Sequence, residues 1–308
     1  MRTLKLGTRG SKLALTQSRF VRDQLEDKTG LAVEIEVIKT TGDRITDRSF
    51  DQMEGEGFFT KEIEEALLTR RIDLAVHSLK DLRTTMPDGL TVGAVGFRED
   101  RREFLIMRPG LRQESGVLPL PAGAVIGTSS ARRQSQIAFY NPDLRIKDLR
   151  GNVPTRVEKV RQGDYDAIIV AAAGVTRLNL DLSDLEAVWL APQLFLPAPG
   201  QGILAIQNRS SDAEIEEVIA TLDSESARIE VALERGLLAL FDAGCSLPLG
   251  VYSEVESDRF HLAAVLGKRD GSSWKGLDKA EADGKSVDEV VNAVYADLTS
   301  NDYKANQD

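Results

Sequence analysis

Cysteine is nearly absent from this chain of 308 residues, which has only Cys245. One cysteine cannot form a disulfide within the chain, and this composition fits a reducing compartment, so we expect a cytoplasmic protein. Long apolar runs are also lacking, since no stretch reaches the roughly 20 apolar residues that span a bilayer. The first residues, MRTLKLGTRGSKLALTQ, contain no apolar core typical of a signal peptide. We therefore expect neither a leader nor membrane contact.

Histidine is scarce too, with two residues, and no spacing of His, Cys, Asp or Glu resembles a metal site. We therefore expect no metal. Basic residues are outnumbered by acidic ones, 39 to 49, and the net charge of -10 argues against nucleic-acid binding, which requires a basic surface. Arginines nevertheless gather beside Gly, Ser and Thr in the middle of the chain. A basic site in an acidic protein indicates a small anionic ligand, either a phosphate or a carboxylate.

Strand and helix patterns alternate along the first two thirds of the chain. Short segments of alternating or continuous apolar residues are followed by segments with apolar residues at helical spacing. This alternation predicts βαβ units and a largely parallel sheet. The strand patterns cover 4–6, 33–37, 72–76, 125–126, 144–146 and 167–173, and helix patterns cover 13–25 and 59–67.

The last third has a different character. Its helix and strand patterns predict a small α+β domain, and the final helix is amphipathic because its apolar residues recur at i, i+3, i+4, i+7 and i+11. The segments are a helix over 224–241, strands over 251–255 and 260–265, and a helix over 287–298.

Two segments have the composition of domain crossings. Residues 98–103 are charged, and residues 191–202 hold three prolines and two glycines, which is typical of a stiff connector. We interpret a strand pattern at 203–205 as a return to the first domain. The predicted domains are a first α/β lobe (1–99 plus 200–218), a second α/β lobe (104–193) and a C-terminal α+β domain (222–308).

One strand, turn and helix pattern combines hydroxyls with arginines. The turn follows Gly127, and the next residues place hydroxyls and N–H groups at a helix N-terminus, where the helix dipole attracts anions. Two arginines in the first turn are unfavourable beside that dipole unless an anion compensates, which favours a ligand. The alternative is a capped helix with two solvated arginines. The side chains are Thr128, Ser129, Ser130, Arg132 and Arg133.

Other turns repeat this arrangement. Residues 149–156 combine a Gly-Asn turn, a proline near a helix start and arginines on both sides, residues 7–11 add another turn, and a further arginine follows Gly174. Arginine suits carboxylates because its planar fork can bind both oxygens at once. One such turn is weak evidence for an anion-binding site, but several in one chain are stronger evidence. The side chains are Arg9, Ser11, Arg150, Arg156 and Arg177.

The segment His77-Ser-Leu-Lys-Asp81 directly follows a predicted buried strand. Lys80 and Asp81 are therefore expected at the carboxyl end of that strand, where open α/β sheets bind ligands. A carboxylate there could support a developing positive charge or accept hydrogen bonds from ligand N–H groups. A surface Lys–Asp pair is the alternative. We interpret His77 as structural.

Cys245 is the remaining candidate. An isolated cysteine is usually a small buried apolar residue. This one lies between Gly244 and Ser246 in a predicted loop, where a ligand can approach closely. Its context therefore favours a functional thiol.

Taken together, these segments resemble the porphobilinogen deaminase family. Six motifs occur in the family's order and at its approximate spacing over nearly the whole chain. No single motif is decisive, but the ordered set is highly specific. The motifs are GTRGS at 7–11, HSLKD at 77–81, GTSSARRQ at 127–134, LRGNVPTR at 149–156, PGQG at 199–202 and AGCSLPLG at 243–250.

The resemblance implies two lobes similar to type II periplasmic binding proteins, with the active site between them, and a third domain that carries a cofactor loop. It implies a transferase of haem and porphyrin biosynthesis that condenses four porphobilinogen molecules head to tail, releases ammonia and frees hydroxymethylbilane by hydrolysis. It also implies a monomer and a dipyrromethane cofactor joined by a thioether to Cys245.

The family's functional residues map onto this chain. The catalytic aspartate matches Asp81, which would assist ammonia loss and stabilise the azafulvenium and pyrrole N–H groups. The resemblance assigns two sets of binding residues. Those for the cofactor are Cys245, Ser78, Lys80, Asp81, Thr128, Ser129, Ser130, Arg132, Arg133 and Arg150; those for the substrate are Arg9, Ser11, Arg150, Arg156 and Arg177.

The chain departs from the family pattern at a few positions. Glu56 lies where many relatives have lysine, Arg83 where proline is frequent and Pro199 where a non-proline is common, while Asp242-Ala243 replaces Glu-Gly. None of these changes removes a proposed catalytic group. Two other functions stay open: a non-enzymatic two-lobed protein that senses an anion, and a phosphoribosyl-type transferase, which would need an acidic metal cluster.

Overall fold

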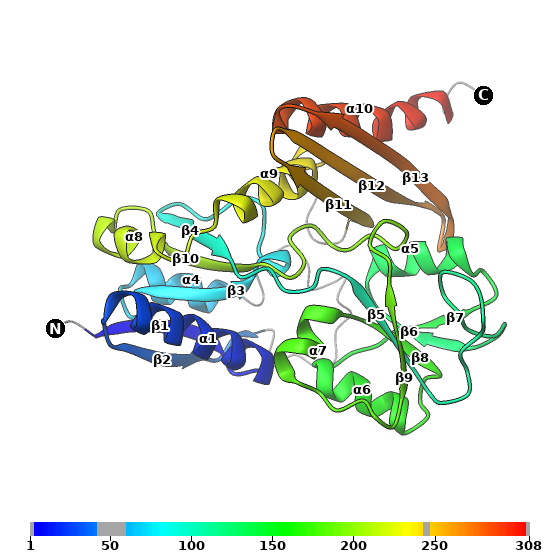
Figure 1. Cartoon of the computed structure of the whole chain (residues 1–308), viewed down its shortest axis with the longest axis horizontal. Helices are drawn as coiled ribbons and strands as arrows, with labels where there is room; N and C mark the ends of the chain where they lie inside the picture. Colours follow the sequence, from blue (N-terminus) through cyan, green and yellow to red (C-terminus); the bar gives the residue numbers. More distant parts are fainter. Residues whose placement is uncertain (1–2, 42–59, 243–246, 306–308) are drawn as a thin grey trace. The chain divides into compact units, whose positions relative to one another are not determined.

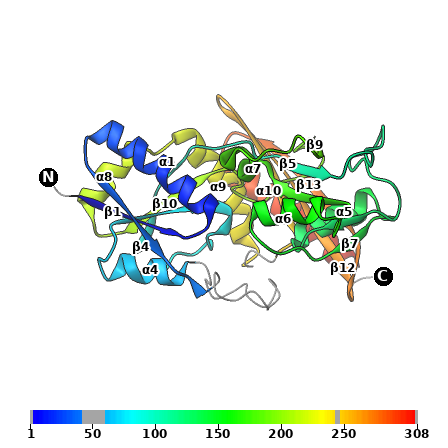
Figure 2. The same cartoon turned by 90° about the horizontal axis from the view of Figure 1, so that it is seen from below.

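The computed structural model describes residues 3–41, 60–242 and 247–305, and the chain builds three β-sheets within them. Two sheets have five strands and the third has three. Figures 1 and 2 show the elements with their labels. The chain divides into two compact units, a first unit of Met1–Glu99 with Gly202–Arg228 and a second unit of Asp100–Gln201 with Ile229–Asp308.

The first unit contains a sheet with the strand order β2-β1-β3-β10-β4. The strands β1, β2 and β3 are parallel, whereas β10 runs antiparallel to both β3 and β4. Figure 1 shows β10 beside β3 and β4, although it lies far from both in the sequence. The strands are β1 Leu4–Arg9, β2 Val33–Ile38, β3 Leu74–Ser78, β4 Leu90–Gly96 and β10 Leu204–Arg209.

Helices cover both faces of this sheet because the strands carry apolar side chains on both sides. Helices α1 and α8 pack Val21 and Ile219 into one core cluster, while α4 packs Ile63 into another. Figure 2 shows α1 and α4 on opposite sides of the strands. The helices are α1 Lys12–Thr29, α4 Lys61–Leu68 and α8 Ala213–Ala220.

The second unit begins with a sheet of order β7-β6-β8-β5-β9. Along β5, Leu105 and Met107 pack with α5, and Phe104 and Ile106 pack with α6 and α7, so alternate side chains enter two different cores. The strands are β5 Glu103–Met107, β6 Val125–Gly127, β7 Arg145–Lys147, β8 Ala167–Ala171 and β9 Glu186–Leu190. The helices are α5 Ala131–Tyr140, α6 Val153–Arg161 and α7 Ala172–Leu178.

The two five-stranded sheets share one topology. In each, one strand (β1 or β6) lies between two parallel neighbours, and a strand antiparallel to both its neighbours (β10 or β5) lies between this parallel group and the edge strand (β4 or β9). The predicted α/β lobes are therefore confirmed, and so is the strand that returns to the first sheet as β10, although both sheets are mixed because β10 and β5 run antiparallel to their neighbours. The three predicted domain boundaries stay a prediction.

The third sheet is an antiparallel meander followed by the last helix. Helices α9 and α10 cover one face, where Leu237 and Val294 join its core. The sheet also approaches α5 closely, because a Cβ at Gly267 would lie 2.5 Å from the Cβ of Ser135. The elements are α9 Glu225–Leu240, β11 Leu249–Glu256, β12 Arg259–Asp270, β13 Ser273–Gly284 and α10 Val287–Ala305.

Some predicted boundaries differ from the structure. The strand predicted at 72–76 is Leu74–Ser78, and the one predicted at 167–173 ends at Ala171, because the small residues after it begin helix α7. The helix predicted over 59–67 begins at Lys61, and Phe59 lies outside the described residues.

Candidate active site

The first group of predicted site residues lies at the carboxyl ends of β1 and β3. These strands are parallel neighbours, so their carboxyl ends meet at one edge of the sheet. After β1 the chain continues to β2 on one side of this pair, and after β3 it continues to β4 on the other side. Ligands of open α/β sheets bind at such a point, where the strand order reverses. Arg9 ends β1 and Ser78 ends β3, followed by the short 3₁₀-helix Leu79–Asp81. The predicted placement of Lys80 and Asp81 is confirmed.

The hydroxyls in this group already have partners in the chain. Ser11 is the N-cap of α1 and accepts a hydrogen bond from the backbone N–H of Ala14 at 3.2 Å. Ser78 accepts one from the side-chain Nε2 of Gln17, which is buried on α1, at 2.9 Å. No sequence motif marks Gln17, whose only signal is its place as a polar residue on the inner face of an amphipathic helix. Asp81, in contrast, is exposed.

His77 is buried between these elements. Its Nε2 lies 3.1 Å from Oε1 of Gln207 on β10. Burial lowers the pKa of His77 to about 4, with a smaller decrease from the charge of Arg9, while the hydrogen bond to Gln207 opposes the change. The ring is therefore neutral near pH 7, which agrees with the structural role predicted for it.

This burial gives stability a pH dependence. The folded protein resists protonation of His77 down to about pH 4, whereas an unfolded histidine takes up a proton near pH 6.5. Lowering the pH from 6.5 to 4 should therefore cost about 3 kcal/mol through this residue, at about 1.4 kcal/mol for each pH unit. We expect His77→Gln to remove that part of the loss. Urea unfolding of both proteins at pH 7 and pH 4 measures it, and an equal loss in both would contradict the assignment.

The second group of predicted residues surrounds the N-terminus of α5, directly after β6. Ser130 is the N-cap, and its hydroxyl accepts from the N–H of Arg133. Thr128 accepts from the N–H of Ser130 at 3.2 Å. Ser129 both donates to the carbonyl of Leu149 and accepts from its N–H. The predicted strand, turn and helix are confirmed, and these hydroxyls hold the turn and the neighbouring loop in place.

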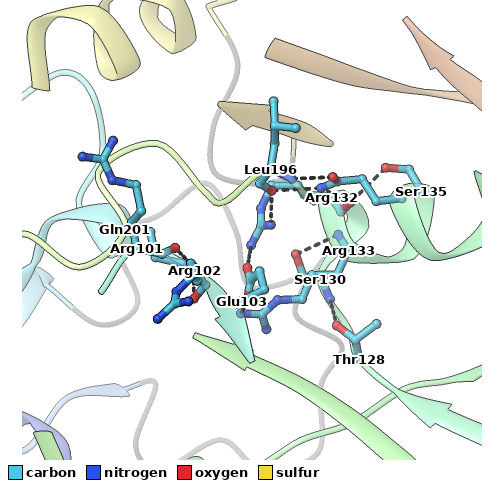
Figure 3. A network of polar contacts seen from close by, with 11 residues as sticks. Arg101, Arg102, Glu103, Thr128, Ser130, Arg132, Arg133, Ser135, Leu196 and Gln201 are labelled. Atoms are coloured by element: carbon cyan, nitrogen blue, oxygen red, sulfur yellow. Dashed lines mark hydrogen bonds and ion pairs between the residues drawn. The ribbon is translucent and has the colours of Figure 1, made fainter. Parts of the chain in front are cut away.

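Arg132 and Arg133 are both buried against a carboxylate. Glu103, at the start of β5, accepts from Nη2 of Arg132 at 2.6 Å and from Nη2 of Arg133 at 2.8 Å (Figure 3). Burial lowers the pKa of Arg132, and the charge of Glu103 opposes this effect. The alternative of two solvated arginines is therefore wrong. The anion expected from the sequence is supplied, at least in part, by the chain itself.

A second turn of this lobe follows β7. Gly151 has a φ of 113°, which favours glycine, and Asn152 caps α6 by accepting from the N–H of Thr155 at 3.0 Å. Nε of Arg156 donates to the carbonyl of Gly151 at 2.6 Å, and Arg150 is half-buried beside this turn. The Gly-Asn turn and the helix start predicted from the sequence are confirmed.

Arg177 occupies a different setting from the one expected. Gly174 was interpreted as part of another strand-to-helix turn, but it lies inside α7, so Arg177 is in the last helical turn. The small residues 171–174 form the start of a helix here, which removes the turn. This prediction is therefore corrected.

Some predicted positions lie outside the described residues. Cys245 and Glu56 are among them. The elements that flank Cys245 are described: α9 ends at Leu240 and β11 begins at Leu249, so the cysteine lies on the connection between them. Within the described ranges, no cluster of three His, Cys, Asp or Glu residues could hold a metal ion. Nor does any described helix have the length and apolar character needed to cross a membrane.

Comparison with protein families decides what kind of protein carries these turns. Residues 4–217 match the family model "Porphobilinogen deaminase, dipyromethane cofactor binding domain", and residues 228–293 match "Porphobilinogen deaminase, C-terminal domain". The chain belongs to the porphobilinogen deaminase family. The predicted function, a transferase of tetrapyrrole synthesis, is confirmed by this membership, and no match favours the non-enzymatic alternative.

Curated porphobilinogen deaminases resemble the chain over most of its length. The protein of Maridesulfovibrio salexigens is 46% identical over 280 residues, covering 91% of this chain and 89% of its own. That of Bacillus velezensis is 41% identical over 307 residues, covering 99% and 96%. Among solved structures, the periplasmic sulfonate-binding protein SsuA of Methylobacillus flagellatus KT is 10% identical, with a TM-score of 0.44 over 76% of this chain and 73% of that one.

Proposed function

We propose that the chain holds a dipyrromethane cofactor through a thioether to Cys245 and uses it to prime hydroxymethylbilane synthesis. The match to a dipyrromethane-binding family model supports the cofactor. A thioether requires a cysteine, and Cys245, which comes between α9 and β11 in the sequence, is the single cysteine of the chain. When bound, the cofactor supplies the pyrrole carbon to which the first porphobilinogen is joined.

The second unit has suitable donors for the carboxylates of such a group. Among the described residues, Nε of Arg133 is buried and has no hydrogen-bond partner, so this guanidinium keeps a donor for a ligand. The N-terminus of α5 adds positive potential beside it. Acetate and propionate groups match this donor set, since arginine binds carboxylates through two parallel N–H bonds. From the second unit we assign Thr128, Ser129, Ser130, Arg132, Arg133 and Arg150 to cofactor binding. From the first unit we assign Ser78, Lys80 and Asp81 to it as well.

We assign the catalytic step to Asp81. Its carboxylate is exposed at the carboxyl end of β3, next to Lys80, where a substrate can reach it. A negative charge at that point stabilises the positive charge that develops on porphobilinogen as ammonia leaves, and the carboxyl group can move a proton to the departing amine. Asp81 ends the short 3₁₀-helix Leu79–Asp81, whose conformation fixes its backbone at this position.

The substrate's own carboxylates require further cations. Arg9 ends β1, and Arg150 lies on the connection between β7 and α6. Arg156 and Arg177 lie on α6 and α7, and Ser11 caps the helix after β1. The observation that carries the whole proposal is this repetition: both sheets have the same topology, and polar side chains follow β1 and β3 in the first sheet and β6 and β7 in the second. We assign Arg9, Ser11, Arg150, Arg156 and Arg177 to substrate binding.

We further propose that the enzyme works in the cytoplasm as a monomer. A thioether can form only if Cys245 is a free thiol, and a reducing compartment keeps it so.

The stoichiometry of ammonia release tests the proposed function. Purified protein incubated with porphobilinogen should release one ammonia for each molecule consumed, and four for each hydroxymethylbilane formed. Ammonia by coupled assay and product by chromatography measure both quantities in one sample. Saturable binding of porphobilinogen without ammonia would instead support the non-enzymatic alternative.

A further inference from the structure

Glu103 is a fully buried carboxylate within the charged segment 98–103. It is the first residue of β5, and its exposed fraction is 0%. Each oxygen serves a different arginine, Oε1 accepting from Arg132 and Oε2 from Arg133. Figure 3 shows the carboxylate between the two guanidinium groups. One acid therefore fixes the positions of two neighbouring cations.

The two arginines differ in how many of their side-chain hydrogen-bond donors have partners. Nη1 of Arg132 also donates to the carbonyl of Leu196 at 2.8 Å, so this guanidinium is held from two sides. The side-chain amide of Gln136 donates from Nε2 to the same carbonyl at 3.0 Å and accepts at Oε1 from the N–H of Leu196 at 2.7 Å, which keeps that carbonyl in place. Arg133 has one hydrogen bond to Glu103, and its Nε has no partner among the described residues although the side chain is only 7% exposed.

The charges of the cluster also do not balance. Two guanidinium groups and one carboxylate leave a net positive charge in a buried place, next to the N-terminus of α5. Buried charge is unfavourable unless it is compensated. An anionic ligand that accepts from Nε of Arg133 would supply the missing negative charge and satisfy the unpaired donor.

We propose that Glu103 is a positioning residue of the cofactor site: it holds Arg132 and Arg133 apart and oriented, so that Nε of Arg133 faces a ligand carboxylate. This inference rests on the proposed function, in which these arginines bind the cofactor. Glu103 itself touches no ligand. Its effect on binding comes through the geometry of the two arginines.

The variant Glu103→Gln distinguishes positioning of the two arginines from simple neutralisation of their charge. The amide has one acceptor where the carboxylate has two, and its NH₂ group would face an arginine donor, so one guanidinium has to turn away. If Glu103 only reduced the positive charge, its loss would make the site bind anions more tightly. If it positions the arginines, its loss weakens carboxylate binding despite the higher positive charge.

We expect Glu103→Gln to carry much less cofactor, measured by intact mass, and to lower kcat/KM by about 10- to 100-fold, since displacements near 1 Å can cost about 100-fold. Glu103→Asp keeps the negative charge, but its side chain is one methylene shorter, so the carboxylate lies farther from the two guanidinium groups. It should carry less cofactor than the wild type but more than Glu103→Gln, measured by intact mass.

A matched control comes from a buried pair in the first unit. Asp212 accepts from Nη2 of Arg209 at 2.6 Å, and both side chains are buried. Asp212→Asn should lower the thermal midpoint as Glu103→Gln does, yet keep the full cofactor content and the wild-type KM. A purely structural role for Glu103 predicts that both variants lose cofactor only in proportion to unfolding.

The outcomes are distinct. Full cofactor content in Glu103→Gln overturns the inference, and so does loss of cofactor to the same degree in Asp212→Asn. If Glu103→Gln does not fold, Glu103→Asp decides, and wild-type cofactor content in that variant overturns the inference. Wild-type protein without any cofactor mass would instead overturn the proposed function.

Discussion

Asp81→Ala is expected to lower kcat by about 100- to 10,000-fold, which is the usual contribution of a positioned acid or base. The cofactor should persist in this variant, because the proposed attachment is through Cys245 and the proposed carboxylate contacts of the arginines do not involve Asp81. Asp81 is exposed, so its removal should change the stability little. Steady-state kinetics together with intact mass measure both effects on the same preparation.

Asp88→Ala is the matched control for this prediction. Asp88 is another exposed carboxylate of the first unit, in the turn before β4, and no role is assigned to it. We expect it to keep wild-type kcat. Turnover in Asp81→Ala within a factor of about three of wild type would reject Asp81 as the catalytic carboxylate, since the loss expected is at least about 100-fold.

Cys245→Ser should abolish turnover for a different reason. A serine hydroxyl stays protonated at neutral pH and is a far weaker nucleophile than a thiolate, so the cofactor cannot be attached. Ser246→Ala, one residue further along, keeps the thiol and should stay active. An active Cys245→Ser enzyme would contradict the assignment of the cysteine.

The elements that carry local signals could be predicted from the sequence. The turn after Gly127, the Gly-Asn turn at 151–152 and the position of Asp81 after a buried strand all follow from short-range rules for turns, caps and strand ends. The amphipathic helix over 287–298 was equally readable, because its apolar residues keep a helical period and α10 uses them to cover the third sheet.

Features that depend on distant parts of the chain could not be predicted in the same way. Glu103 lies in a run of charges that looks solvated, and only the neighbouring strands and α5 make it buried. Likewise, Gln17 and Ser78 are 61 residues apart, and no local pattern pairs them. The turn predicted at Gly174 was wrong for the opposite reason: glycine is a local turn signal, but this one lies inside helix α7.

The most direct test of the central claim is the intact mass of the purified wild-type protein. The account predicts an excess over the sequence mass equal to two condensed pyrrole units, present in the wild type and in Ser246→Ala and absent from Cys245→Ser. Peptide mapping should place the excess on the peptide that contains Cys245. A fully active wild-type protein with the unmodified sequence mass would contradict the account.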